Sequence, residues 1–174
     1  MLSGDGYTPE QIRKLGRRAA ITEHFYREPH KSVDIVLTGK KTPRASWKQP
    51  KISMIEYIKR AYNKYKYMLY LEGNDLGSNV WWTYKPNCVV LRPAIVKCVC
   101  VYDMYLKPWK HYVPFDPLHP EDIIEKINWC EKNTNKCLDM IKCAGNVHAV
   151  VMDKNIRHET YKIMAKKIKD NLII

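Results

Sequence analysis

The sequence lacks an apolar run as long as the roughly 20 residues that a membrane-spanning helix needs. The longest candidate, residues 93–105, is interrupted by Lys97 and Asp103. The first residues also lack the basic segment followed by an apolar segment that is typical of a signal peptide. These absences predict a protein that is cytoplasmic as written, with neither a membrane span nor a secretory leader.

The spacing of a zinc site is missing as well. Structural zinc sites favour Cys-x-x-Cys pairs with a second pair nearby, and none of the cysteines is spaced in this way. We therefore predict no metal site and expect buried free thiols, although a disulfide between Cys130 and Cys137 stays open. The cysteines are Cys88, Cys98, Cys100, Cys130, Cys137 and Cys143.

Signatures of nucleic-acid binding are also absent, because the chain has no zinc-finger spacing, no RNA-recognition aromatic signature and no glycine-arginine tract. The formal net charge is nevertheless +12, which attracts partners that carry phosphate: nucleotides, nucleic acids or acidic membrane surfaces. Lysines and arginines are spread along the whole chain. A solvated basic surface is the simplest interpretation, and a basic nucleic-acid-binding protein is a second alternative.

No internal repeat or low-complexity tract interrupts the 174 residues, of which 45% are hydrophobic and 28% charged. Such a chain can bury a proper core and is predicted to form one globular domain over residues 1–174. We divide it into an N-terminal helix, strand and loop (1–52), a core (53–150) and a closing amphipathic helix (151–174).

Helix and strand signals alternate along the chain. The order helix, strand, loop, helix, strand predicts an α/β fold with a Rossmann-like parallel sheet flanked by helices. Residues 88–91 form an apolar run that predicts a strand buried on both faces. Helices are expected at 8–26, 54–65, 77–84, 99–106, 120–132, 134–145 and 155–172, and strands at 32–37, 66–71, 88–91 and 111–114.

The most informative stretch is Tyr67–Trp82, where a strand-like run breaks at Gly73 and restarts as a helix. A glycine-bearing turn between a buried strand and a helix leaves backbone N–H groups unpaired and directs a helix dipole outward. Both features suit a diphosphate. The stretch therefore predicts a nucleotide-phosphate cradle.

Several segments resemble one known glycosyltransferase family, which includes the fungal capsule-associated proteins and the Rumi-type protein O-glucosyltransferases. The resemblance covers about residues 4–145, and Leu-x-Pro-x-x-His-Tyr-Val-Pro is its most specific part. The segments are Lys66-Tyr67, Glu72–Asp75, Ser78, Val89–Leu91, Leu106–Pro114, Lys126–Cys130 and Asn133.

The resemblance implies the C-terminal, Rossmann-like domain of a GT-B glycosyltransferase that transfers a sugar, glucose or xylose, from a UDP-sugar to a glycan or protein hydroxyl. No catalytic base is assigned, because the family's N-terminal acceptor domain has no counterpart here, and a separate protein that supplies this domain is an expected partner. The residues implied to contact the UDP-sugar are Gly73, Asn74, Asp75, Gly77, Ser78, Asn79 and His111.

Two departures from the family pattern bear on activity. Asn79 stands where many members carry an arginine, so a charge-assisted phosphate contact is missing. The family's more acidic relatives place a glutamate and a tryptophan near the positions of Cys98 and Cys100, and Asp103 stands where a second acid is expected. A catalytically inactive remnant that binds nucleotide sugars or docks a partner is therefore the first alternative.

Other candidate residues have a structural interpretation beside the functional one. Glu72 and Asp75 are placed to bind a metal or a ribose, or to cap the next helix. His111 either approaches the nucleotide or is a satisfied structural residue. The pair Trp81-Trp82 and also Trp109 either stack on a uracil or sugar ring or pack in the core, and Trp47 is expected to be more exposed.

Overall fold

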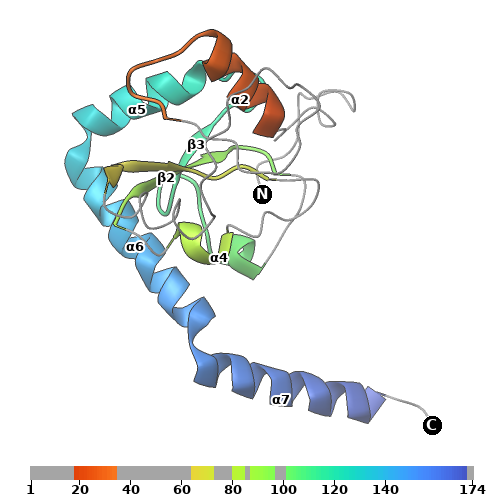
Figure 1. Cartoon of the computed structure of the whole chain (residues 1–174). Helices are drawn as coiled ribbons and strands as arrows, with labels where there is room; N and C mark the ends of the chain where they lie inside the picture. The colour runs from red at the N-terminus through yellow and green to blue at the C-terminus, as the bar shows by residue number, and fades with distance from the viewer. Residues whose placement is uncertain (1–17, 35–63, 73–79, 85–86, 97–100, 172–174) are drawn as a thin grey trace.

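The computed structural model describes residues 18–34, 64–72, 80–84, 87–96 and 101–171. Within them a parallel sheet lies between helices on its two faces (Figure 1). This arrangement confirms the predicted α/β class. The helical elements are α2 (Arg18–Arg27), α4 (Val80–Thr83), η1 (Val101–Met104), α5 (Asp122–Lys132), α6 (Thr134–Met152) and α7 (Lys154–Asn171).

The sheet contains β1 (Tyr67–Leu69), β2 (Val89–Pro93) and β3 (Val113–Phe115) in the order β1-β2-β3. Both pairings are parallel, with Leu69 opposite Leu91 and Leu91 opposite Val113. Every residue of β2 is buried, as expected for a central strand that is covered on both faces. The prediction of a doubly buried strand in this segment is confirmed.

Alternate residues of the strands build two separate cores, because successive side chains of a strand point to opposite faces of the sheet. On one face the sheet packs against α2, α5 and the first turns of α6. The strand residues of this core are Tyr67, Leu69, Leu71, Val89, Leu91, Val113 and Phe115, and their helical partners include Ile21, Phe25, Ile123, Ile127, Cys137 and Met140.

The opposite face packs against α4, η1 and the later turns of α6. Its core combines sheet-face residues Tyr70, Val90 and Tyr112 with Val80, Tyr84, Tyr102, Leu106, Ala144, Val147 and Val151. Helix α6 thus contributes to both cores. It continues beyond its predicted end near residue 145, because Val147 and Val151 still find apolar partners on this face.

Helix α5 returns from the carboxyl edge of the sheet to its amino edge. Its first residue, Asp122, accepts a hydrogen bond from the backbone N–H of Asp116, just after β3, at 2.8 Å. Near its end Glu131 accepts bonds from Lys66 Nζ at 3.1 Å and from Tyr67 Oη at 2.7 Å, where β1 begins. Helix α6 therefore starts at the amino edge.

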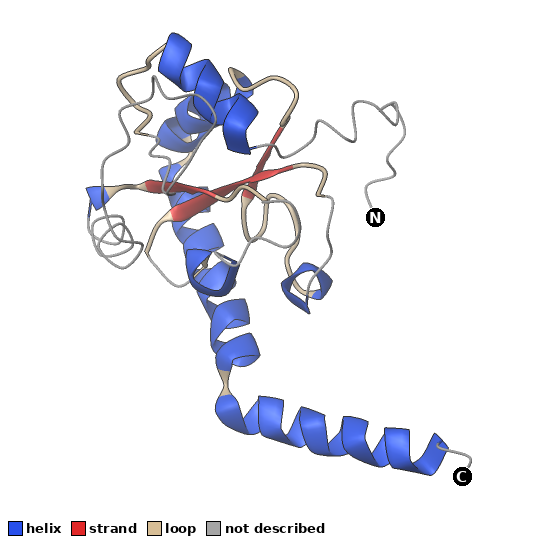
Figure 2. Cartoon of the chain, turned by 45° about the vertical axis from the view of Figure 1, so that its right-hand side comes forward, coloured by secondary structure: helices blue, strands red, loops and turns tan. Residues whose placement is uncertain are grey.

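Helix α7 extends away from the sheet and its covering helices (Figure 2), and all of its residues are exposed. Asp153 separates it from α6 by adopting an extended backbone conformation. The Asp153 carboxylate then accepts hydrogen bonds from the N–H groups of Asn155 and Ile156, at 2.7 and 3.0 Å, and so caps α7. The predicted helix is confirmed, and its apolar residues are exposed.

Other boundaries differ from the predictions. Strand β3 begins at Val113 rather than at residue 111, and the described part of the helix expected at 99–106 contains a 3-10 turn at 101–104. Residues 32–34 form a turn and loop instead of the start of a strand, and the expected helix at 54–65 lies almost wholly outside the described residues. In the ranges that the structure describes, no helix is both long and apolar enough to cross a membrane.

Candidate functional site

The carboxyl edge of the sheet is where parallel α/β proteins usually bind their ligands. Strand β1 ends there and leads into Glu72, which is 1% exposed. Helix α4 follows at Val80, which is fully buried. The predicted cradle residues Gly73, Asn74, Asp75, Gly77, Ser78 and Asn79 lie between these two points, outside the described residues.

The turn after β3 is held at the same edge by Asp116. One carboxylate oxygen of Asp116 accepts a hydrogen bond from the N–H of Leu118 at 2.9 Å, and the other lies 2.9 Å from His119 Nδ1. The hydrogen bond to the Asp116 carboxylate raises the pKa of His119. Asp122 also pairs with Lys126 at 2.8 Å. The start of α5 is thereby fixed to the end of β3.

Behind this edge, on the face covered by α4 and η1, lies a buried arginine. The Arg92 guanidinium, on β2, forms an ion pair with Asp103 of η1 and donates a hydrogen bond to Tyr84 Oη at 3.4 Å. It also lies 5.0 Å from the ring centre of Tyr70 and 5.4 Å from that of Tyr112. The guanidinium thus contacts side chains from the chain just after β1, the chain just before β3, the end of α4, and η1.

The electrostatics of the cluster favour a permanently charged arginine. Burial by itself opposes the charged form, but Tyr84 and Asp103 outweigh that effect and the pKa of Arg92 is raised. Burial also raises the pKa of Tyr84. Sequence reasoning missed Arg92; the available signal was a charged residue inside the otherwise apolar strand Val89–Pro93.

His111, a predicted ligand of the nucleotide, lies at the opposite edge of the sheet. It precedes β3, and its Nδ1 accepts a hydrogen bond from the backbone N–H of Lys107 at 2.8 Å. The backbone N–H of His111 donates a hydrogen bond to the Lys107 carbonyl at 3.0 Å. Burial, and then the charge of Lys110, lower the pKa of His111. This geometry favours the structural alternative over a nucleotide contact.

Trp109 lies in the turn that His111 closes, and it is 47% exposed. Its φ of 61° is in the left-handed region, which costs a bulky residue about 1–3 kcal/mol. The backbone N–H of Trp109 donates a hydrogen bond to the Tyr112 carbonyl at 2.8 Å. The indole meets that of Trp129 edge to face, with ring centres 4.9 Å apart. The alternative of a core position is therefore wrong for Trp109.

The remaining aromatic and acidic candidates are less informative. Trp81 and Trp82 lie in α4. Trp47 and Asp75 lie outside the described residues, as do Cys98 and Cys100.

Cys88, Cys130, Cys137 and Cys143 are free thiols. Cys137 Sγ donates to the Cys130 carbonyl at 3.7 Å, so these two residues do not form a disulfide. Burial is the main cause that raises the pKa of Cys88 to about 11 and that of Cys130 to about 12. Among the residues with described positions, no three His, Cys, Asp or Glu side chains gather in a way that could hold a metal ion.

The chain is similar to short segments of two viral proteins. It is 28% identical over 100 residues to the uncharacterized protein 035R of invertebrate iridescent virus 3, and 30% identical over 97 residues to the uncharacterized protein 179R of invertebrate iridescent virus 6. These matches cover 53% and 52% of this chain but only 8% of each relative. No family model and no solved structure matches.

Proposed function

We propose that the chain is the donor-binding part of a glycosyltransferase and binds a UDP-sugar at the carboxyl edge of the β1-β2-β3 sheet. In this proposal the sheet belongs to the Rossmann-like domain of a GT-B enzyme. The sugar, glucose or xylose, is transferred to a hydroxyl of a glycan or protein acceptor.

The observation that carries the proposal is the unit formed by β1, α4 and β2. Buried Glu72 ends the segment from β1, buried Val80 opens α4, and β2 then lies parallel to β1. This is the order of elements that brings a glycine-bearing segment to the ligand-binding edge of a parallel sheet. The glycines and polar residues of the predicted cradle occupy that connection in the sequence.

The residue types of this connection suit a diphosphate. Gly73 and Gly77 allow a phosphate to approach the backbone closely, and Ser78 and Asn79 supply neutral hydrogen-bond donors. Because the described part of α4 has four residues, we assign recognition to these donors and to backbone N–H groups, not to a helix dipole. A neutral Asn79 makes the expected affinity lower than an arginine would.

We assign Arg92 a positioning role in this function. Its charge is already paired with Asp103, and its guanidinium lies over the rings of Tyr70 and Tyr112. Tyr70 lies two residues before Glu72, so the cluster supports the strand end from which the cradle segment departs. Stabilisation of the departing diphosphate is the part of catalysis that this domain would supply.

The experiment is a turnover assay with UDP-glucose and UDP-xylose, following UDP release by this chain alone and with candidate acceptor-domain proteins. We expect release, or transfer to a glycan, that Gly73→Val abolishes and Trp47→Ala leaves unchanged. Binding of a UDP-sugar without turnover, both by the chain alone and with every acceptor-domain protein, would support the alternative of a catalytically inactive remnant. Failure of both UDP-sugars to bind would overturn the proposal.

A further inference from the structure

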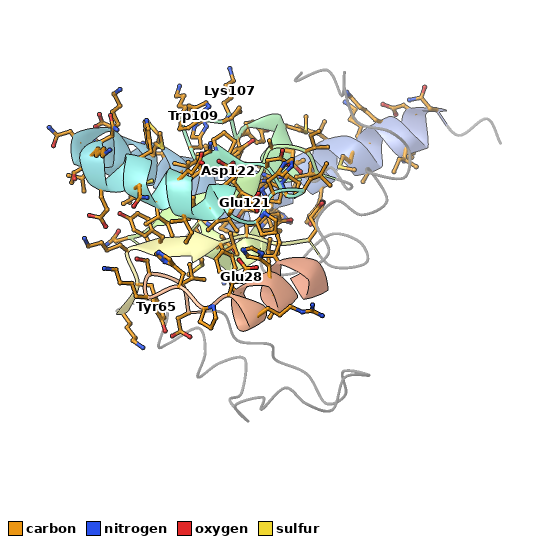
Figure 3. All side chains as sticks on the ribbon, turned by 90° about the horizontal axis from the view of Figure 1, so that it is seen from above. Glu28, Tyr65, Lys107, Trp109, Glu121 and Asp122 are labelled. Carbon is orange, nitrogen blue, oxygen red and sulfur yellow. The ribbon has the colours of Figure 1, made fainter. Side chains whose placement is uncertain are left out.

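We propose that a depression beside Trp109, at the amino edge of the sheet, binds a single pyranose ring of a glycan. The depression is open to solvent and has a volume of about 240 Å³. It is lined by Trp109 and Lys110 from the turn before β3, and by Lys136, Asp139, Met140 and Cys143 from α6. Figure 3 shows Trp109 and Lys107 projecting from the same side of the molecule.

The indole is presented by a rigid turn. Two hydrogen bonds join Lys107 to His111, and a third joins the N–H of Trp109 to the carbonyl of Tyr112. Trp129 supports the ring edge to face. A bulky aromatic residue held at φ 61° and still 47% exposed gains less from packing than a core residue would. Strained backbone of this kind is concentrated at binding sites.

The lining matches the two surfaces of a sugar ring. A pyranose has C–H faces, which are attracted to the electron-rich face of an indole, and a rim of hydroxyl groups. Asp139 is available to accept hydrogen bonds from hydroxyls, and Lys110 is available to donate to their oxygens. The Lys136 ammonium borders the same space and lies 5.9 Å from the ring centre of Trp129. In the described part of the chain, neither Lys110 nor Asp139 has a side-chain hydrogen bond or an ion pair.

Size favours a sugar ring over a nucleic-acid strand. A volume of about 240 Å³ is below the usual range of roughly 300–1,000 Å³ for small-molecule pockets, which limits the contents to about one ring. Asp139 would repel a phosphate that entered beside the base, whereas it is a good acceptor for a hydroxyl. An acceptor between donors, beside an exposed indole, therefore suits the hydroxyl rim of a single sugar ring.

This inference does not rest on the proposed function. The predicted cradle follows the carboxyl end of β1, whereas Trp109 and Lys110 precede the amino end of β3. The depression would be a surface site that anchors a glycan, and the glycan bound there would not contact the UDP-sugar. Loss of one site is expected to leave binding at the other unchanged.

The test measures binding of maltopentaose, cellopentaose and xylopentaose to the intact chain by saturation-transfer NMR and calorimetry. We expect millimolar binding by at least one of them. Trp109→Asn should weaken it about tenfold, the loss of one aromatic anchor, and Asp139→Asn should weaken it as well. Asparagine tolerates the left-handed conformation, so the turn is kept, and a melting temperature that is not lowered, with an unchanged circular dichroism spectrum, would verify this.

Tyr161→Asn is the matched control, because Tyr161 is an exposed aromatic residue on α7 that lies outside the depression. This variant should bind as the unchanged protein does. No binding of any of the three glycans, or binding that Trp109→Asn leaves intact, would overturn the proposal. Tighter binding of a single-stranded oligonucleotide that Trp109→Asn abolishes would also overturn it, because the ligand would then be a nucleic acid.

Discussion

Arg92 and Asp103 form an ion pair that joins β2 to η1, with only 2% of the arginine and 13% of the aspartate side chain exposed. The pair connects the central strand to the segment that leads toward β3. Burying two charges costs free energy, so the intact pair adds little net stability. Loss of one partner is strongly destabilising, because the other charge is then buried without a counter-charge.

We expect Asp103→Asn to lower the free energy of unfolding by about 3 kcal/mol, because it leaves the Arg92 charge buried without its carboxylate. Urea denaturation followed by circular dichroism measures this change. The double variant Arg92→Met with Asp103→Leu removes both charges and should be less destabilised than the single variant. Equal losses in the single and double variants would mean that the ion pair does not control the stability of this face.

His111 should make stability fall in mild acid. Its pKa is lowered in the folded protein from the ordinary value of 6.5, so the unfolded chain takes up the proton more readily. The stabilising contribution is therefore complete above about pH 6.5 and is lost as the pH falls through the lowered folded-state pKa. Thermal melts between pH 8 and pH 5, at intervals of about half a unit, would follow this loss.

His119 acts in the opposite sense, because Asp116 raises its pKa and its contribution is lost as the pH rises. The comparison is therefore between the unchanged protein and His111→Asn, which keeps an acceptor near the N–H of Lys107. We expect a shallower decline with acid in this variant. Identical pH profiles would show that His111 does not titrate with folding.

Native-state alkylation should distinguish the cysteines. Burial raises the pKa of Cys88 to about 11 and that of Cys130 to about 12, and it raises that of Cys137 as well. Thiolates react with iodoacetamide and thiols do not, so these three residues should stay unlabelled near pH 8. Cys143 is partly exposed and should react first among the described cysteines. Peptide mapping by mass spectrometry checks the order, which early labelling of Cys88 or Cys130 would contradict.

The sheet could be predicted from the sequence because its signals are local. Strand β2 is apolar except for Arg92, and alternating helix and strand signals suffice to predict parallel pairing. Helix α7 was predicted for the same reason. Its position was not, because periodicity shows that a helix has an apolar side but not whether another element covers it.

The side-chain clusters could not be predicted because they depend on distant contacts. Arg92 is neutralised by Asp103, eleven residues away on η1. Trp109 has a positive φ and an exposed side chain, and no neighbouring glycine in the sequence indicates this conformation. Strand β3 starts late because His111 and Lys107 close a turn where the sequence indicates extended chain.

The most direct test of the central claim is calorimetric titration of the intact chain with UDP-glucose, UDP-xylose and UDP. We predict binding of at least one UDP-sugar in the millimolar range or tighter, with Gly73→Val abolishing it and Trp109→Asn leaving it unchanged. Heat signals indistinguishable from dilution for all three ligands, in a protein whose melting curve shows that it is folded, would contradict the claim.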